Sequence, residues 1–219
     1  DSLKLYGRKC IDLIWWLENA DAYGVHTLAM VQGDALGGGL EAALAFHKVI
    51  VQSNVQAGFP EVLFNLFPGM GAWNFTIRKA GFAVANDMIL SGRMYNSEEL
   101  QRSGLADMVV ESGSADAALE QLVRTIDPRH KGTLAALRAR RRAAPIAYET
   151  FVDIVDQWAH SAIQLTDRDL RLMERLVRAQ VRKVGGSEGG AVEEIKRIEL
   201  EDAWRAAGGP PKASNMDHA

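Results

Sequence analysis

The chain of 219 residues carries 25 Lys and Arg against 28 Asp and Glu, a formal net charge of −3. So small a charge gives no general argument for a protein that binds nucleic acid or a membrane surface. Apolar residues make up 47%, which is typical of a globular protein. The single cysteine, Cys10, excludes an intrachain disulfide. No apolar run reaches the roughly 20 residues that a membrane span requires. We therefore expect a soluble cytoplasmic protein.

The first half of the chain has the pattern of an α/β protein. Apolar residues at helical spacing alternate with short β-rich runs, and glycines separate them. The expected elements are a helix over 3–18, a buried strand over 26–31, a helix over 41–46, a strand over 48–52, an irregular loop with one helical turn over 59–71, helices over 72–80, 83–90 and 97–103, and a strand over 108–110. For the last of these helices, Ser97 with Glu98 and Glu99 is the expected N-terminal signal.

The second half has a helical pattern throughout. The expected helices cover 114–126, 131–143, 146–164 and 167–183, and one more covers 193–207. Residues 185–190 (GGSEGG) have the composition of a flexible linker, and the tail from Gly208 is expected to be disordered. We therefore divide the chain into an α/β core (1–112), a C-terminal helical segment (113–183), and a linker, helix and tail (184–219).

A glycine-rich turn is the most informative stretch. Gly37, Gly38 and Gly39 precede a helix, so the backbone turns tightly and presents bare N–H groups to a negative charge. Glu41 follows in the first turn of that helix. A carboxylate there gains roughly 0.3–1 kcal/mol from the helix dipole, which is a purely structural reading. Glu41 is also flanked by Leu40 and Ala42 in apolar surroundings, which favours an acid or base with a disturbed pKa.

A second isolated carboxylate is Glu61, the only charged residue between Lys48 and Arg78. Such a residue more often caps a helix or forms a hydrogen bond than takes part in catalysis. However, the strand over 48–52 separates Glu61 from Glu41, so both side chains can reach one end of the sheet. Two carboxyl groups beside an anion-binding turn suit proton removal next to a carbonyl, coupled to loss or addition of water.

The same glycines satisfy a dinucleotide-binding pattern, G-x-G-x-x-A, over 37–42. The context argues against a nicotinamide enzyme. Several residues separate the strand from the first glycine, and Glu41 places a negative charge near the expected pyrophosphate.

These motifs resemble the crotonase (enoyl-CoA hydratase/isomerase) superfamily. The resemblance rests on four segments and extends from Leu3 to Arg182. The segments are 29–44 (AMVQGDALGGGLEAAL), 60–71 (PEVLFNLFPGMG), 88–92 (MILSG) and 98–107 (EELQRSGLAD). Within it, 61–71 and 171–180 (RLMERLVRAQ) are similar to the branch that makes the diffusible signal factor, a cis-2-unsaturated fatty acid signal. The resemblance implies a crotonase-like ββα spiral core with a C-terminal helical segment, assembled as a homotrimer or hexamer.

The resemblance also implies a site and a mechanism. Glu41 and Glu61 fall on both catalytic glutamates of the hydratase-type members, and Gly38 on one N–H donor of the oxyanion hole. The other donor comes from an earlier strand–loop segment that is absent from the sequence. Either that segment lies upstream of Asp1, or the protein lacks a complete oxyanion hole. Glu61 is expected to remove the Cα proton, and Glu41 to protonate the departing hydroxyl. The acyl pocket is placed at Gly37, Met70, Trp158, Leu172 and Leu176.

A basic run over 129–142 contains six Lys and Arg and no Asp or Glu. Most such runs are solvated helix faces. The functional reading is a docking site for acyl carrier protein or the phosphates of coenzyme A at Arg138, Arg140, Arg141 and Arg142. RNA binding is less favoured because no aromatic residues are interleaved. The five histidines are scattered, so we expect no metal site, and no cofactor beyond the carrier of the substrate.

The main functional prediction is an acyl-thioester dehydratase that also hydrolyses the thioester. It would convert a 3-hydroxyacyl chain on acyl carrier protein into a cis-2-unsaturated acid. The first alternative is an enoyl-CoA hydratase, which shares every residue above. The alternative from another class is a non-catalytic crotonase-fold binding protein.

Overall fold

The computed structural model describes residues 2–184, so the predicted linker, the helix over 193–207 and the tail lie outside the described residues. In chain order the elements are α1 (Ser2–Glu18), η1 (Ala20–Tyr23), β1 (Leu28–Val31), β2 (Ala35–Leu36), α2 (Gly38–Leu44), β3 (Lys48–Gln52), β4 (Gln56–Gly58), η2 (Pro60–Phe64), α3 (Ala72–Ala80), α4 (Phe82–Ser91), β5 (Tyr95–Asn96), α5 (Ser97–Ser103), β6 (Met108–Val110), α6 (Ala115–Ile126), η3 (Asp127–Arg129), α7 (His130–Ala143), α8 (Tyr148–Ala162) and α9 (Asp167–Val184). The α/β class is confirmed, and helices alone follow β6 within the described residues.

Two small sheets form the centre of the protein. The first has the strand order β1-β3-β6, and all its strands are parallel, as expected for strands joined by helices. Leu28 is paired with Lys48, and Val51 with Val109. Strand β1 therefore lies at an edge of this sheet. The second sheet has the order β2-β4-β5, with β2 parallel and β5 antiparallel to β4.

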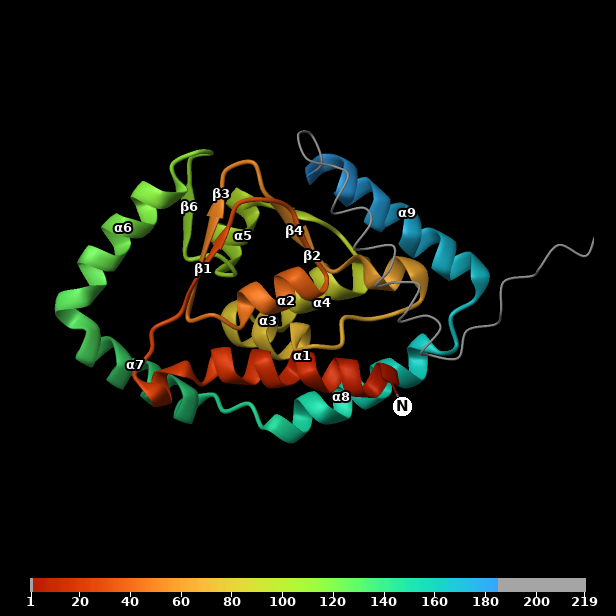
Figure 1. Cartoon of the computed structure of the whole chain (residues 1–219), viewed down its shortest axis with the longest axis horizontal. Coiled ribbons are helices and arrows are strands. Elements are labelled where there is room, and N and C mark those ends of the chain that lie inside the picture. Colours follow the sequence, from red (N-terminus) through yellow and green to blue (C-terminus); the bar gives the residue numbers. More distant parts are fainter. Residues whose placement is uncertain (1, 185–219) are drawn as a thin grey trace, which may run out of the picture.

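Helices cover the sheets and hold the C-terminal segment against the core. Helices α1 and α8 run side by side along one border of the molecule, while α6 with α7 and α9 lie at opposite ends (Figure 1). Phe75 of α3 and Phe151 of α8 are fully buried, with their ring centroids 5.6 Å apart. Burial of side chains of this size stabilises the fold by about 1.5–3 kcal/mol each. This packing holds α8 against α3, the helix that follows the loop after η2.

The second sheet was not predicted, because strands of two or three residues carry no periodicity. The predicted helix over 97–103 is confirmed as α5, but its N-terminal signal was assigned one residue too late. The N-cap is Asn96, whose side chain accepts a hydrogen bond from the Glu99 N–H while the Glu99 side chain accepts one from the Asn96 N–H. The Ser97 hydroxyl instead donates to backbone carbonyls at Gln52 and Val55. Within residues 2–184, no helix combines the length and apolar character that crossing a membrane requires.

Candidate active site

The turn before α2 is built on Gly37. Its φ of 53° lies in the left-handed region, and its N–H donates to the Gly58 carbonyl at 2.9 Å, which joins the turn to β4. The Gly37 carbonyl accepts the N–H groups of Leu40 and Glu41, both at 3.0 Å. The N–H groups of Gly38 and Gly39 stand at the start of α2, where no helical carbonyl precedes them, and they have no acceptor among residues 2–184. They are available to an oxygen atom of a ligand.

Glu41 projects from α2 into the interior and is 1% exposed. Its Oε1 atom accepts the N–H groups of Met70 at 2.6 Å and Ala72 at 3.0 Å, from the loop between η2 and α3. Burial, reinforced by the charge of Glu61, raises the pKa of Glu41 to about 8 despite these two N–H donors. The carboxyl group is therefore fixed in place and holds a proton near neutral pH.

Glu61 lies in η2 and faces the same turn. Its Oε1 atom is 2.3 Å from the position that a Cβ atom would take on Gly37. Its Oε2 atom is buried and has no hydrogen-bond partner within the described residues. Burial raises the pKa of Glu61 to about 7. An unpaired buried carboxylate oxygen is costly for folding, and such costs concentrate at functional sites.

The structure thus brings Glu41, Glu61 and the Gly37–Gly38 turn together. Because the two carboxyl groups repel each other when both are charged, they share one proton over the range between their pKa values. One group can then act as a base while the other acts as an acid. The free N–H of Gly38 beside them can stabilise a developing oxyanion. The expected second oxyanion donor stays a prediction.

Two of the predicted acyl-pocket residues, Met70 and Trp158, pack on glycines of the site. The Cε atom of Met70 is 2.7 Å from the position of a Cβ on Gly38, so Met70 lies directly over the turn. The Trp158 side chain packs on Gly69, where a Cβ would meet Trp158 Cγ at 2.5 Å. Leu172 and Leu176 are half-buried on α9. Their role in holding an acyl chain stays a prediction.

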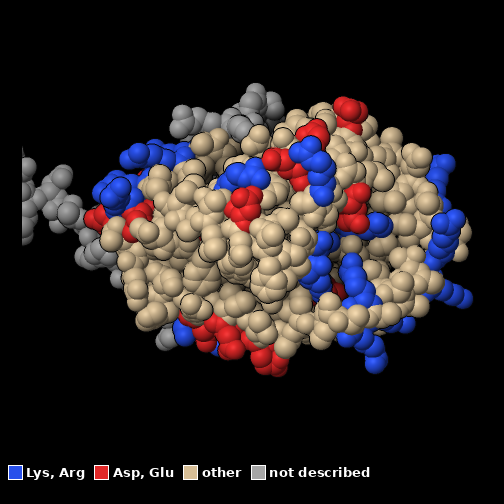
Figure 2. Space-filling view, turned by 180° about the vertical axis from the view of Figure 1, so that it is seen from behind, with Lys and Arg blue, Asp and Glu red and all other residues tan. Residues whose placement is uncertain are grey.

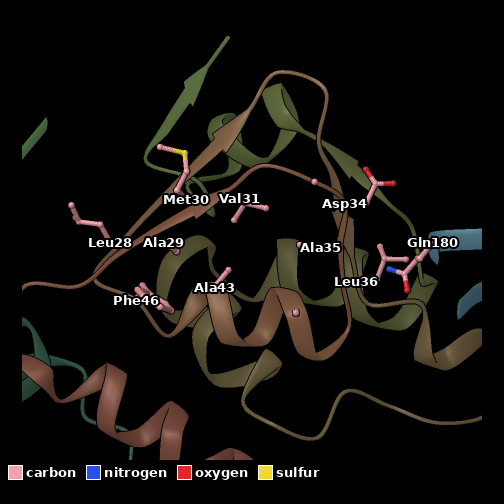
Figure 3. Close-up of a pocket in the computed structure, with 12 residues that line it drawn as sticks. Leu28, Ala29, Met30, Val31, Asp34, Ala35, Leu36, Ala43, Phe46 and Gln180 are labelled. Carbon is pink, nitrogen blue, oxygen red and sulfur yellow. The ribbon is translucent and has the colours of Figure 1, made fainter. Parts of the chain in front are cut away.

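A cavity of about 590 Å³ opens beside the edge strand β1 (Figure 3). Its walls come from β1, the β1–β2 connection, β2, one side of α2 at Gly39 and Ala43, Phe46 after α2, and Gln180 of α9. Neither Glu41 nor Glu61 lines it, and neither do the predicted acyl-pocket residues. The cavity therefore adjoins the site across α2 but is distinct from the space between the carboxyl groups.

The predicted carrier-binding arginines lie on α7, at the opposite end of the molecule from α9 (Figure 1). Two of them contact η1 and the residue before it. Arg141 hydrogen-bonds to Asn19 at 2.5 Å and pairs with Asp21 at 3.2 Å, while Arg138 donates to the Asp21 carbonyl at 2.9 Å. Arg140 and Arg142 are exposed. On the back face, basic side chains are spread over both ends and the middle, with acidic side chains among them near the middle (Figure 2).

The sequence did not identify every residue that shapes the site. The backbone donors at Met70 and Ala72 carry no signature, because any residue supplies an N–H. Asn65, which ends η2 with φ of 58°, was also missed. A signal for it existed, since Asn is the residue other than Gly that most readily adopts this conformation.

Comparison with known proteins supports a single family. A family profile described as Enoyl-CoA hydratase/isomerase matches residues 16–144, more than half of the chain. The probable enoyl-CoA hydratase echA8 of Mycobacterium tuberculosis is 36% identical over 124 residues, which are 57% of this chain and 47% of that protein. The human peroxisomal bifunctional enzyme is 38% identical over 100 residues, which are 46% of this chain and 14% of that protein.

Solved structures of this family have a similar fold. Carnitinyl-CoA hydratase from Mycobacterium avium superposes with a TM-score of 0.57 at 27% identity, covering 63% of this chain and 54% of that one. Enoyl-CoA hydratase from Bacillus anthracis gives a TM-score of 0.58, covering 79% and 67%; at 22% identity it supports the fold alone. The chain spans less than half the length of the two curated relatives, the Mycobacterium tuberculosis hydratase and the human bifunctional enzyme. With the fold, the paired glutamates and the profile in agreement, the chain belongs to the enoyl-CoA hydratase/isomerase family.

Proposed function

We propose that this protein interconverts a 3-hydroxyacyl thioester and a 2-enoyl thioester, as an enoyl-CoA hydratase-type lyase. One observation carries the proposal: Glu41 and Glu61 are held together at a turn with a free N–H, and both have raised pKa values near 7 and 8. Burial of two neighbouring carboxyl groups costs stability, and such costs concentrate at functional sites, where acid–base catalysis uses the raised pKa values.

In the dehydration direction, the ionised Glu61 accepts the proton from C2 of the substrate. The electron pair left on C2 forms the new double bond to C3 as the C3–O bond breaks. Glu41 gives its proton to the departing oxygen, which leaves as water. Negative charge develops on the thioester oxygen meanwhile, and we assign its stabilisation to the Gly38 N–H. Hydration runs through the same steps in reverse. This assignment agrees with the lower pKa of Glu61, since the group that ionises first serves as the base.

Three of the four relatives above have coenzyme A thioesters in their names, which favours coenzyme A over acyl carrier protein as the carrier in this proposal. None of them is named as a signal synthase. The dehydratase–thioesterase reading that led the sequence analysis is therefore the less favoured one. A product assay separates the two: a hydratase leaves a thioester in reversible equilibrium, whereas a signal synthase releases a free cis-2-unsaturated acid. The homotrimer or hexamer is likewise proposed, and light scattering on the purified protein measures it.

The test measures hydration of a short-chain 2-enoyl-CoA, followed as loss of the conjugated-thioester absorbance. Glu41→Gln and Glu61→Gln keep the side-chain shape, and each is expected to reduce kcat by at least about 100-fold, as expected when an essential proton-transfer group is removed. Glu98→Gln, at an exposed carboxylate of α5, is the matched control and is expected to match the wild type. No turnover by the complete wild-type protein, together with intact binding of an acyl-CoA, supports the non-catalytic alternative instead.

A further inference from the structure

We propose that Asn65 and Asp169 form a latch between η2 and α9, and that Asn65 is a positioning residue for Glu61. This inference rests on the proposed function, because it assigns Asn65 a role in that reaction. It concerns residues 104 positions apart in the sequence, which the fold brings into direct hydrogen-bond contact.

Asn65 belongs to the same turn as Glu61. Its N–H donates to the Val62 carbonyl at 3.3 Å, and the next N–H, of Leu66, donates to the Glu61 carbonyl at 3.0 Å. The left-handed conformation of Asn65 ends the turn. Any shift of Asn65 therefore changes the backbone from which the Glu61 side chain projects.

Asp169 anchors the other half of the latch. It is 7% exposed, and its Oδ1 atom accepts the side-chain N–H of Asn65 at 2.7 Å. Its Oδ2 atom accepts the Thr166 N–H at 2.9 Å and the Thr166 hydroxyl at 2.7 Å, which closes the first turn of α9. Both carboxylate oxygens are thus engaged, and these hydrogen bonds hold the pKa of Asp169 below its usual range. Through these hydrogen bonds, the Asp169 carboxylate links the start of α9 to Asn65.

The two glutamates differ in how they are held. Glu41 is gripped directly, by the N–H groups of Met70 and Ala72. The Oε2 atom of Glu61 has no such partner within residues 2–184. The orientation of Glu61 consequently depends on the backbone of η2, and α9 packs against that turn. A shift of about 1 Å in a reacting group can cost about 100-fold in rate. The anchoring of η2 is therefore expected to affect kcat.

Substitutions at Asn65 alone remove the hydrogen bond of the latch and leave the Thr166–Asp169 hydrogen bonds of α9 in place. Asn65→Gly keeps the left-handed conformation at no steric cost but removes the hydrogen bond. We expect kcat to fall about 10-fold with KM changed less than about twofold, the pattern of a disturbed reacting group. Asn65→Asp places two carboxylates face to face and is expected to be worse. The double variant Asn65→Asp with Asp169→Asn restores the bond with its direction reversed, and is expected to recover kcat to within about threefold of wild type.

A second measurement does not depend on turnover. Amide hydrogen exchange at Leu66 is expected to accelerate in Asn65→Gly and to return to the wild-type rate in the double variant, because the latch restrains this turn. Wild-type exchange and wild-type kcat in Asn65→Gly would overturn the latch while leaving the hydratase proposal intact. Failure of the double variant to improve on Asn65→Asp would overturn it as well. A wild type without turnover but with the expected exchange pattern would overturn the proposed function and the kinetic role of Asn65, and leave the latch as a structural contact.

Discussion

The Oε1 atom of Glu61 lies 2.3 Å from the position where a Cβ atom would stand on Gly37. Gly37 also has φ of 53°, a conformation that L-residues rarely adopt. The absence of a side chain at this one position therefore serves two ends: it permits the turn, and it leaves the space that the carboxyl group occupies.

Gly37→Ala is expected to reduce activity far more than stability. The new methyl group displaces the Glu61 carboxyl, which is the movable end of a side chain, while the backbone strain costs on the order of 1–3 kcal/mol. We expect a loss of at least about 100-fold in kcat/KM with a protein that remains folded by circular dichroism. Gly132→Ala is the control, since no atom lies within 4 Å of its Cβ position. Equal activities of the two variants would show that Gly37 is not needed.

The rate is expected to follow a bell-shaped pH profile. Dehydration requires Glu61 ionised and Glu41 protonated, so kcat/KM should rise as pH increases through about 7 and fall as pH increases through about 8. The same single-proton form of the pair supports hydration, so both directions should give one profile. Initial rates between pH 5 and 10 measure it. A flat profile contradicts an acid–base role for the pair.

Stability is expected to decrease with rising pH. The pKa values of Glu41 and Glu61 in the folded protein lie above the ordinary value of 4.5, so between pH 4.5 and 8 the folded state binds more protons than the unfolded state. The free energy of unfolding therefore falls across this window. Glu41→Gln should remove part of the slope and raise stability at pH 9, by on the order of a few kcal/mol. Urea unfolding at pH 5 and pH 9 measures this, with Glu98→Gln as the unchanged control.

The interior position of Glu41 and its pairing with Glu61 were predictable from the sequence. Each is an isolated charge in an apolar stretch, which indicates a buried carboxyl group. The long helices were predictable because their apolar periodicity extends over many residues, and β3 because Val49, Ile50 and Val51 form a β-branched run. By contrast, β2 and β5 have two residues each and depend on a partner strand distant in sequence. Only the folded chain defines them.

The arginines of α7 show another limit. Their spacing indicated a solvated or carrier-binding face, yet Arg141 reaches Asp21, a residue 120 positions earlier whose side chain is 1% exposed. A sequence pattern on one helix cannot reveal an ion pair that the tertiary fold creates. Asn65 and Asp169 are a second case, since neither residue is unusual in its own segment.

Arg141 and Arg142 are expected to behave differently on charge reversal. Arg141→Glu places a like charge beside Asp21, whose side chain is 1% exposed, and should lower the melting temperature. Arg142 is exposed, so Arg142→Glu should leave the melting temperature unchanged. If the carrier docks here, Arg142→Glu should raise KM and weaken its salt dependence. An unchanged KM at low salt would remove α7 from the docking surface.

Trp158→Ala is expected to loosen the loop that holds Glu41. The Trp158 side chain packs on Gly69, next to the Met70 N–H that donates to Glu41. Loss of the ring should reduce the free energy of unfolding by about 2–4 kcal/mol. As a predicted wall of the acyl pocket, it should also shift the preference between medium- and long-chain substrates. Trp16→Ala, at an exposed indole of α1, is the control. Unchanged preference would remove Trp158 from the pocket.

The position of β1 at the border of its sheet has a consequence for how the protein behaves in solution. Along Leu28–Val31, one row of main-chain donors and acceptors faces away from β3 and meets no other strand within residues 2–184. Such a row can form main-chain hydrogen bonds with another extended polypeptide. The hollow in Figure 3 runs along the same strand, so a polypeptide that adheres there would also close it and reshape the surroundings of α2.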